Sequence, residues 1–434
     1  MQAFITKQEL KMSEEQNLNN NKKKKILMLC DFPLMFSGVA VQANYLITQL
    51  IKTGKYSFKV FGGARKHEQY DLVKVNDDYI IKPVDNFGTK EQLRQALVSE
   101  KPDILLLFTD PRFFYWVWEM EDEIHQICPI AYWHVWDNDP VPVFNKPLYE
   151  STDLINCLSD KTYNLVRQIV PNKNVNYVPH SLPEDLFRPL SDVEITKWKQ
   201  QILKNRWDHF VCLWVNRNAH RKKPVDLIWA WKEFVNNLEK KYGHKRAVLV
   251  MHTDPFDREG SNLIERAGMF GVLDQVTFST DKLSLEQMNV LYNIADCGVN
   301  ISSSEGFGLN ALESLYCEKP LISIKTGGLT RQIVNVNDQS ENGVAIQPGA
   351  RRFIGGGDVP YIFEDHVNIE DVTNAFMQVY EWGTDKRKEV GTKARKYALS
   401  EFNFEKMISS WDDSLEHLVL TWRQNYKSWS LTEI

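Results

Sequence analysis

The residues best suited to chemistry lie between Ser302 and Leu315, where an apolar run is followed by three serines, a glycine-containing turn and another apolar segment. A strand ending at this turn and a helix beginning after it would direct the backbone N–H groups of Gly308, Leu309 and Asn310 outward, with the positive end of the helix dipole behind them. Because Gly308 has no side chain, a ligand can approach the backbone closely. The stretch therefore predicts an anion site that suits a phosphate.

Two carboxylates flank this turn, Glu305 within it and Glu313 eight positions later in the expected helix. At about 100° per residue they are roughly 80° out of register, so both can lean toward one side. At about 1.5 Å per residue they lie roughly 12 Å apart, beyond the roughly 5 to 9.5 Å between the acid and base of a glycoside hydrolase. We interpret them as binding groups at the two ends of an extended ligand. Two surface glutamates on a capped helix are the alternative, which explains the glycines poorly.

A second chemical signal is a basic segment that follows the expected strand of residues 210–215. Arg217 and Lys222, with Arg221 and Lys223 beside them, bring cations to the carboxyl end of that strand. There they can neutralise a diphosphate. A solvated basic loop is the alternative interpretation, and the position of the segment opposite the glycine turn favours the anion site.

Alternating elements must position these groups. From residue 25 onward, short apolar runs alternate with segments of helical period, which predicts parallel sheets covered by helices on both faces. The strands expected in the first series are residues 26–30, 58–61, 103–108, 130–133, 154–157 and 175–178. Those expected in the second series are residues 210–215, 247–251, 276–278, 298–301, 321–324 and 343–346. The series break at residues 179–183, which we interpret as the boundary between two doubly wound units.

Helical patterns and one glycine-rich segment complete the chain. The expected helices include residues 39–51, 225–240, 285–294, 309–317, 329–334, 367–382, 385–400 and 404–420. The segment from Arg351 to Asp358 contains three consecutive glycines, which could form an anion nest. We interpret it instead as a flexible surface insertion.

Composition excludes several classes of protein. The chain has 434 residues, 57 of them acidic and 52 basic, so its formal charge of −5 provides no overall cationic field for nucleic acid, and its length suggests two or three domains. The six cysteines are widely spaced, which predicts reduced core residues and a cytoplasmic protein. No apolar run reaches the about 18 residues of a membrane span. The segment 1–24 is polar and leads into a run of four lysines at residues 22–25, which predicts a flexible tail and leaves peripheral contact with a membrane open.

Together these motifs resemble the retaining glycosyltransferases of the GT-B fold, specifically glycosyltransferase family 4. Glu305 to Glu313 reproduces the family's E-x7-E motif within Glu-Gly-Phe-Gly-Leu, and Arg217 with Lys222 matches its R-x4-K pair. The segment 177–189 resembles the family's interdomain stretch. The three motifs occur in the family's order, and the resemblance covers nearly the whole chain after its first two dozen residues.

The resemblance implies an α/β protein with two Rossmann-like, doubly wound domains that face each other across a cleft. The expected organisation is a flexible tail at residues 1–24, an acceptor-side domain at 25–190, a nucleotide-sugar-binding domain at 191–403, and a helix at 404–434 that crosses back to the first domain.

The resemblance also implies catalytic roles for four residues. In the family, the residues matching Arg217 and Lys222 bind the diphosphate and stabilise the charge that develops as it leaves. The residue matching Glu305 lies beside the donor sugar, which His134 is expected to face from the first domain, although a hydrogen-bonded core histidine is the alternative. The donor-binding residues implied by the resemblance or by the basic segment are Gly38, Arg221, Gly306, Phe307, Gly308, Leu309, Asn310 and Glu313, the last of these on the ribose hydroxyls.

The predicted function is transfer of a hexose-type sugar from a UDP- or GDP-sugar to a hydroxyl of a glycan, lipid or other acceptor. Retention of anomeric configuration is expected, with no metal or other cofactor. Three alternatives stay open at this point. Asp137 and Asp139 form a D-x-D sequence, which in GT-A enzymes holds a divalent ion on the donor diphosphate. The same fold also serves nucleotide-sugar epimerases, and it could bind a nucleotide sugar without transferring it.

Overall fold

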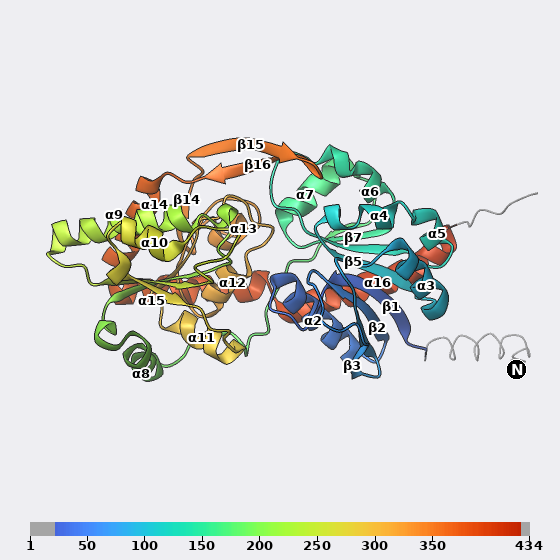
Figure 1. Cartoon of the computed structure of the whole chain (residues 1–434), viewed down its shortest axis with the longest axis horizontal. Coiled ribbons are helices and arrows are strands. Elements are labelled where there is room, and N and C mark those ends of the chain that lie inside the picture. Colours follow the sequence, from blue (N-terminus) through green and yellow to red (C-terminus); the bar gives the residue numbers. More distant parts are fainter. Residues whose placement is uncertain (1–21, 427–434) are drawn as a thin grey trace, which may run out of the picture.

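Two sheets of mostly parallel strands, one in each half of the chain, form the framework of the protein (Figure 1). This computed structural model describes residues 22–426. The predicted tail at residues 1–24 lies outside the described residues except for its last three lysines, and Lys24 begins the first strand. No helix in the described part of the chain has the length and apolar character needed to span a membrane.

The first sheet has eight strands in the order β3-β4-β2-β1-β5-β6-β7-β8. Its strands are β1 Lys24–Asp31, β2 Tyr56–Gly63, β3 Val73–Asn76, β4 Tyr79–Pro83, β5 Ile104–Thr109, β6 Ile130–His134, β7 Leu154–Cys157 and β8 Val175–Tyr177. All neighbours pair in parallel except the edge strand β3, which is antiparallel to β4. Every residue of β5 is buried, as expected for a strand covered by helices on both faces. The helices are α2 Gly38–Lys52, α3 Lys90–Glu100, α4 Tyr115–Trp118, α5 Glu121–His125, α6 Lys146–Glu150 and α7 Asp160–Ile169.

The second sheet has six parallel strands in the order β11-β10-β9-β12-β13-β14. They are β9 Phe210–Val215, β10 Ala247–His252, β11 Val276–Ser279, β12 Cys297–Asn300, β13 Leu321–Ile324 and β14 Gly343–Ile346. The helices of this half are α8 Asp192–Leu203, α9 Pro224–Tyr242, α10 Leu263–Met269, α11 Leu285–Asn293, α12 Leu309–Tyr316, α13 Leu329–Ile333, α14 Ile369–Glu381 and α15 Gly383–Glu401. The prediction of two Rossmann-like, doubly wound domains is therefore confirmed.

The strand order reverses once in each sheet, between β1 and β5 in the first and between β9 and β12 in the second. At such a reversal the connecting loops diverge, and ligands bind in the crevice at the carboxyl ends of the strands. The two crevices lie against each other, because a Cβ placed on Gly38 after β1 would lie 3.3 Å from Cδ1 of Leu309 in the second domain. The fold thus brings the strand ends of both domains to one interface.

The last helix, α16 Phe404–Asn425, returns to the first domain as predicted (Figure 1). The Trp411 ring packs 5.0 Å from the ring of Trp133 in β6. Asp412 accepts hydrogen bonds from Lys55 and from the Tyr56 hydroxyl, both at 2.7 Å. Because Trp411 is fully buried, this helix completes the core of the first domain.

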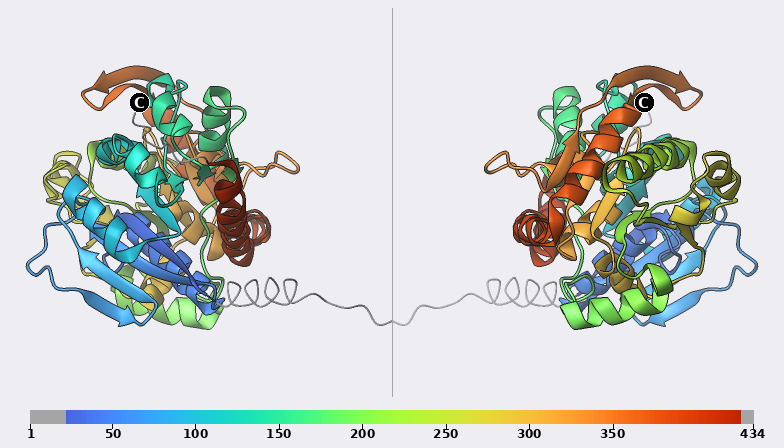
Figure 2. Two further views of the ribbon diagram at one scale, coloured as in Figure 1. Left: turned by 90° about the vertical axis from the view of Figure 1, so that its right-hand side faces the viewer. Right: turned by 90° about the vertical axis from the view of Figure 1, so that its left-hand side faces the viewer.

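A two-stranded antiparallel hairpin, β15 Ala350–Gly356 and β16 Val359–His366, stands apart from both sheets (Figures 1 and 2). It replaces the irregular insertion expected for the glycine-rich segment. The hairpin leaves the second domain and reaches the first, where the Tyr361 hydroxyl accepts a hydrogen bond from the Val143 N–H at 3.2 Å. Tyr115 also donates its hydroxyl to the Asp358 carbonyl at 2.8 Å. The hairpin therefore bridges the two domains.

Candidate functional site

Three charged side chains meet where β9 and β12 end, at the crevice of the second domain. A short 3-10 turn, His220–Lys222, follows β9 and carries both cations. Lys222 donates from Nζ to Oε2 of Glu305, and Arg221 Nη1 lies 3.0 Å from the same oxygen. Arg221 also donates to the Ser304 carbonyl at 3.2 Å. The structure thus joins the basic segment to the glutamate of the turn.

The Lys222–Glu305 pair is almost fully enclosed, with each residue only 7% exposed. Burial would raise the pKa of Glu305, but the neighbouring charges of Lys222 and Arg221 outweigh it and hold that pKa below its ordinary value. Glu305 is therefore ionised at neutral pH. A buried ion pair of this kind leaves an uncompensated charge when one partner is removed.

The turn after Glu305 needs small residues for two separate reasons. Gly308 precedes α12 with a φ of +90°, and a Cβ there would lie 2.5 Å from Cδ2 of Leu329. Gly306 has an ordinary φ, but a Cβ on it would lie 3.1 Å from Oδ1 of Asp137, which belongs to the first domain. Gly308 thus sets the shape of the turn, and Gly306 lets the first domain approach it.

The remaining residues of the turn fix its position. The Phe307 ring lies 5.2 Å from the ring of His180, and its carbonyl accepts a hydrogen bond from Gln332 at 2.6 Å. Asn310 donates to the Val215 carbonyl at the end of β9, 2.7 Å away. Its side-chain oxygen accepts from Asn300 at the end of β12, 3.1 Å away. Asn310 therefore ties together the two strands that border the crevice.

Glu313 lies on α12, four residues after the first residue of that helix and eight residues after Glu305. It accepts a hydrogen bond from the hydroxyl of Tyr292 on α11. Burial raises its pKa to about 7, although the Tyr292 hydrogen bond opposes the shift. Near neutral pH this side chain is therefore close to half ionised, which makes it sensitive to a ligand that needs the carboxylate.

Arg217 does not join the cluster in this structure. Its guanidinium forms two hydrogen bonds with Asp257, at 2.7 and 3.2 Å, and an ion pair with Glu259 at 3.0 Å. The side chain is 58% exposed. Arg221 rather than Arg217 thus accompanies Lys222 beside Glu305.

His134 ends β6 and is fully buried. Its Nε2 lies 2.7 Å from the hydroxyl of Tyr149, and burial lowers its pKa to about 3, so the ring is neutral. The structure places its hydrogen bond in the core of the first domain rather than in the charged cluster.

Asp137 lies three residues beyond the end of β6, and the sequence pattern indicates a different role for it, as part of a D-x-D sequence. Ser304 Oγ donates to its Oδ2 at 3.5 Å, so the carboxylate reaches the turn of the second domain. Asp139, the other acidic residue of the D-x-D sequence, pairs instead with Lys161. The two carboxylates therefore serve separate contacts.

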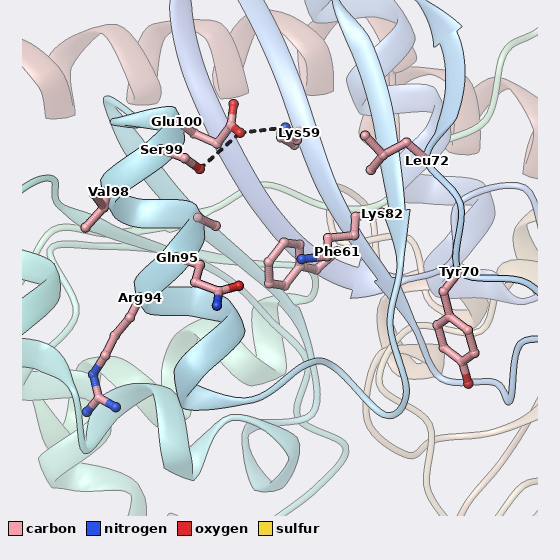
Figure 3. A pocket seen from close by; sticks show the side chains of 11 residues that line it. Lys59, Phe61, Tyr70, Leu72, Lys82, Arg94, Gln95, Val98, Ser99 and Glu100 are labelled. Carbon is pink, nitrogen blue, oxygen red and sulfur yellow. Dashed lines mark hydrogen bonds and ion pairs between the residues drawn. The ribbon is translucent and has the colours of Figure 1, made fainter.

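A cavity of about 810 Å³ lies elsewhere, on the first domain between β2, β4 and α3 (Figure 3). Lys59 and Arg94 at its walls already pair with carboxylates, with Glu100 at 2.6 Å and Glu123 at 2.7 Å. This cavity contains none of the residues predicted for the site.

Comparison with known families finds a match within the second domain. Residues 194–353 match the family model glycosyl transferases group 1. The matched region includes Arg217, Arg221, Lys222, Glu305 and Glu313, and so contains the charged cluster and both glutamates.

Two curated relatives are named as a glycosyltransferase and as a synthase. The chain is 26% identical over 255 residues to the D-inositol 3-phosphate glycosyltransferase of Acidothermus cellulolyticus, an alignment that covers 54% of this chain and 55% of that protein. It is 20% identical over 266 residues to the N-acetyl-alpha-D-glucosaminyl L-malate synthase of Bacillus anthracis, covering 61% of this chain and 59% of that protein. The chain thus spans little more than half the length of these relatives.

Solved structures share the fold along almost the whole chain. A sucrose-phosphate synthase from Thermosynechococcus elongatus matches with a TM-score of 0.71 and 16% identity, over 92% of this chain and 100% of that one. HepE of Anabaena, in complex with UDP and glucose, matches with a TM-score of 0.66 and 16% identity, over 91% and 100%. These likenesses confirm the predicted GT-B fold.

Proposed function

We propose that this protein is a retaining hexosyltransferase of glycosyltransferase family 4. It takes a UDP- or GDP-sugar as donor and a hydroxyl of a glycan, lipid or other molecule as acceptor, and the mechanism uses no metal ion. The observation that carries the proposal is the meeting of Arg221, Lys222 and Glu305 in front of the turn that begins α12. The group 1 glycosyltransferase match over this region supports it.

The cations of the cluster suit the diphosphate of a nucleotide sugar. When the bond between the anomeric carbon and the phosphate oxygen breaks, negative charge grows on the departing diphosphate. Lys222 and Arg221 stabilise that charge after turning from Glu305 toward the phosphate oxygens. The resemblance assigns the same role to Arg217, whose guanidinium must then leave Asp257 and Glu259.

Retention follows if the acceptor attacks the face from which the diphosphate departs. The acceptor oxygen forms the new bond to the anomeric carbon, and its proton passes to the leaving phosphate oxygen. Glu305 then binds a hydroxyl of the donor sugar, and Glu313 binds the ribose hydroxyls. Closure of both domains over the donor excludes water and so limits hydrolysis.

UDP is the first nucleotide to test, because similar structures are named as complexes with UDP or UDP-glucose, or as UDP-forming synthases. Titration calorimetry with UDP, GDP and ADP, with EDTA or with magnesium, measures nucleotide preference and metal dependence directly. A binding constant for UDP or GDP that is unchanged by EDTA is the expected result. Binding of none of the three, or binding only with the metal, contradicts the proposal.

Product analysis separates transfer from the other activities of this fold. A nucleotide sugar is incubated with a panel of sugar, polyol and lipid acceptors, and products are identified by mass spectrometry and proton NMR. A glycosylated acceptor with the anomeric configuration of the donor is expected. Interconversion of nucleotide sugars without an acceptor indicates an epimerase, and binding without any product indicates a binding protein.

A further inference from the structure

The carboxylate of Asp137, from the first domain, lies against the turn of the second domain that carries Glu305. Its Oδ2 accepts a hydrogen bond from Ser304 at 3.5 Å, and a Cβ on Gly306 would lie 3.1 Å from its Oδ1. A Cβ on Gly327 would lie 2.4 Å from the Asp137 carbonyl. Small residues of the second domain thus leave room for Asp137 on both sides.

The hairpin of β15 and β16 contacts Asn138, the residue that follows Asp137. Asn138 donates from Nδ2 to Oδ2 of Asp365 in β16, at 2.9 Å. The same carboxylate accepts from Thr326 at 2.8 Å and from Arg351 at 2.6 Å. Asp365 is only 1% exposed, so these contacts replace water around its charge. The loop that carries Asp137 is therefore fastened at the adjacent position.

Backbone contacts secure the same loop to the hairpin and the hairpin to the site. The Phe363 N–H donates to the Asp139 carbonyl at 2.6 Å, and the Asp365 N–H donates to the Ser303 carbonyl at 2.8 Å. Ser303 lies two residues before Glu305. The hairpin thus sets the position of the Asp137 loop relative to the charged turn.

The charge of Asp137 limits which part of a donor can lie beside it. Burial lowers the pKa of Arg221, but the negative charges nearby, Glu305 first and then Asp137, outweigh burial and hold this pKa above its ordinary value. Asp137 therefore contributes to the electrostatics of the charged cluster. A carboxylate repels a phosphate, whereas it accepts strong hydrogen bonds from hydroxyl groups. A hydroxyl-bearing ring is therefore the ligand group that suits this position.

We propose that Asp137 accepts a hydrogen bond from a hydroxyl of the transferred sugar, and that Asp365, through Asn138, is the positioning residue that holds it there. This inference rests on the proposed function. It adds a residue from the first domain to the donor site and explains why a hairpin of the second domain crosses to the first.

The test compares nucleotide with nucleotide sugar on matched variants. Calorimetry gives the affinities of UDP and of whichever sugar among UDP-glucose, UDP-galactose and UDP-N-acetylglucosamine binds the wild type most tightly. The variants are Asp137→Asn, Asp137→Glu, Asp365→Asn and the control Asp412→Asn. Asp412 is a carboxylate that also joins distant parts of the chain, through Lys55 and Tyr56, but on the far side of the first domain from the cleft.

Asp137→Asn is expected to leave UDP affinity unchanged or to tighten it, because a repelling charge is lost. The affinity of the nucleotide sugar relative to UDP should fall about tenfold or more, since hydrogen bonds to charged groups contribute about 1.5 to 3 kcal/mol. Asp365→Asn should lower this ratio by a smaller factor. Asp412→Asn should leave the ratio unchanged, even where it lowers the melting temperature as much as the Asp137 and Asp365 variants do. If Asp137→Asn does not fold, Asp137→Glu, which keeps the charge but moves it, should lower the ratio without tightening UDP.

The two proposals fail in different ways. A wild type that binds neither nucleotides nor nucleotide sugars overturns the proposed function and this inference with it. A wild type that binds both, with the same affinity ratio in the Asp137 variants, overturns this inference alone. An equal fall of the ratio in Asp412→Asn also overturns it, because the effect is then one of general stability.

Discussion

The two crevices where the strand order reverses have the same topology but opposite chemistry. The crevice of the second domain brings Arg221 and Lys222 to Glu305. The corresponding strand ends of the first domain carry Asp31, the last residue of β1, and Asp110, the residue directly after β5, and burial raises the pKa of both, that of Asp110 to about 6. The fold is similar at both places, so the residue types distinguish them, and the proposed function assigns the diphosphate to the second domain because the cations lie there. The first domain offers hydrogen-bond acceptors, which suit hydroxyl groups.

The largest effect expected is that of removing Lys222. Lys222→Met leaves the buried Glu305 carboxylate without its nearest cation, which should lower the free energy of unfolding by about 3 to 5 kcal/mol. Chemical denaturation of the unliganded protein measures this. The double variant Lys222→Met, Glu305→Gln should regain much of the stability but not the affinity for UDP. Equal stability of the single and double variants would contradict the ion pair as described.

Removing the charge of Glu305 should affect transfer more than binding. Glu305→Gln is expected to lower the rate of transfer by about 100-fold or more, the size found when one group that stabilises a transition state is lost. UDP affinity should stay the same or increase, because Lys222 and Arg221 are then free for the phosphates. Glu318→Gln, two residues beyond the end of α12, the helix that follows Glu305, is the control. Wild-type turnover by Glu305→Gln would refute the role.

The two arginines of the basic segment can be compared directly. Arg221→Ala should weaken UDP binding about 10- to 100-fold, because hydrogen bonds to charged groups contribute about 1.5 to 3 kcal/mol. Arg217→Ala should have a smaller effect, since its exposed guanidinium is already paired with Asp257 and Glu259. Calorimetry on both variants decides between them. A greater loss in Arg217→Ala would show that this segment rearranges when the nucleotide binds.

The smallest effect concerns pH. With a pKa of about 7 in the unliganded protein, Glu313 is mostly protonated at pH 6 and mostly ionised at pH 8. Ribose hydroxyls need the carboxylate as acceptor, so UDP affinity should rise with pH across this window, by at most about tenfold. Glu313→Gln should bind more weakly at pH 8 and lose this dependence. The same slope in the variant would assign the titration to another group.

The buried strands are well predicted by the sequence, because a strand covered by helices is a continuous apolar run. β9, β13 and β14 begin and end at the predicted residues. The edge strand β3 and its neighbour β4 were not predicted. The hairpin was not predicted either. All residues of β15 are exposed, so its sequence lacks the apolar alternation that marks a half-buried strand.

Within the site, residues that belong to local motifs were predicted, whereas contacts between residues far apart in the sequence were not. Lys222 and Glu305 belong to motifs with characteristic neighbours, so both were predicted, and the structure places them in contact. The hydrogen bond from Asn138 to Asp365 joins residues 227 positions apart, and no local sequence pattern predicts such a contact. Asp137 was noticed only as part of a D-x-D sequence, since its approach to Gly306 depends on how two domains meet.

The return of α16 also orders events during synthesis. The first domain is translated first, yet Trp411 and Asp412 supply part of its core and its surface contacts. Its strands can pair as they leave the ribosome, but Trp133 stays without this cover until residues 404–425 have emerged, by which time the second domain has been made. The first domain can therefore complete its core only after the residues of the second domain have been synthesised.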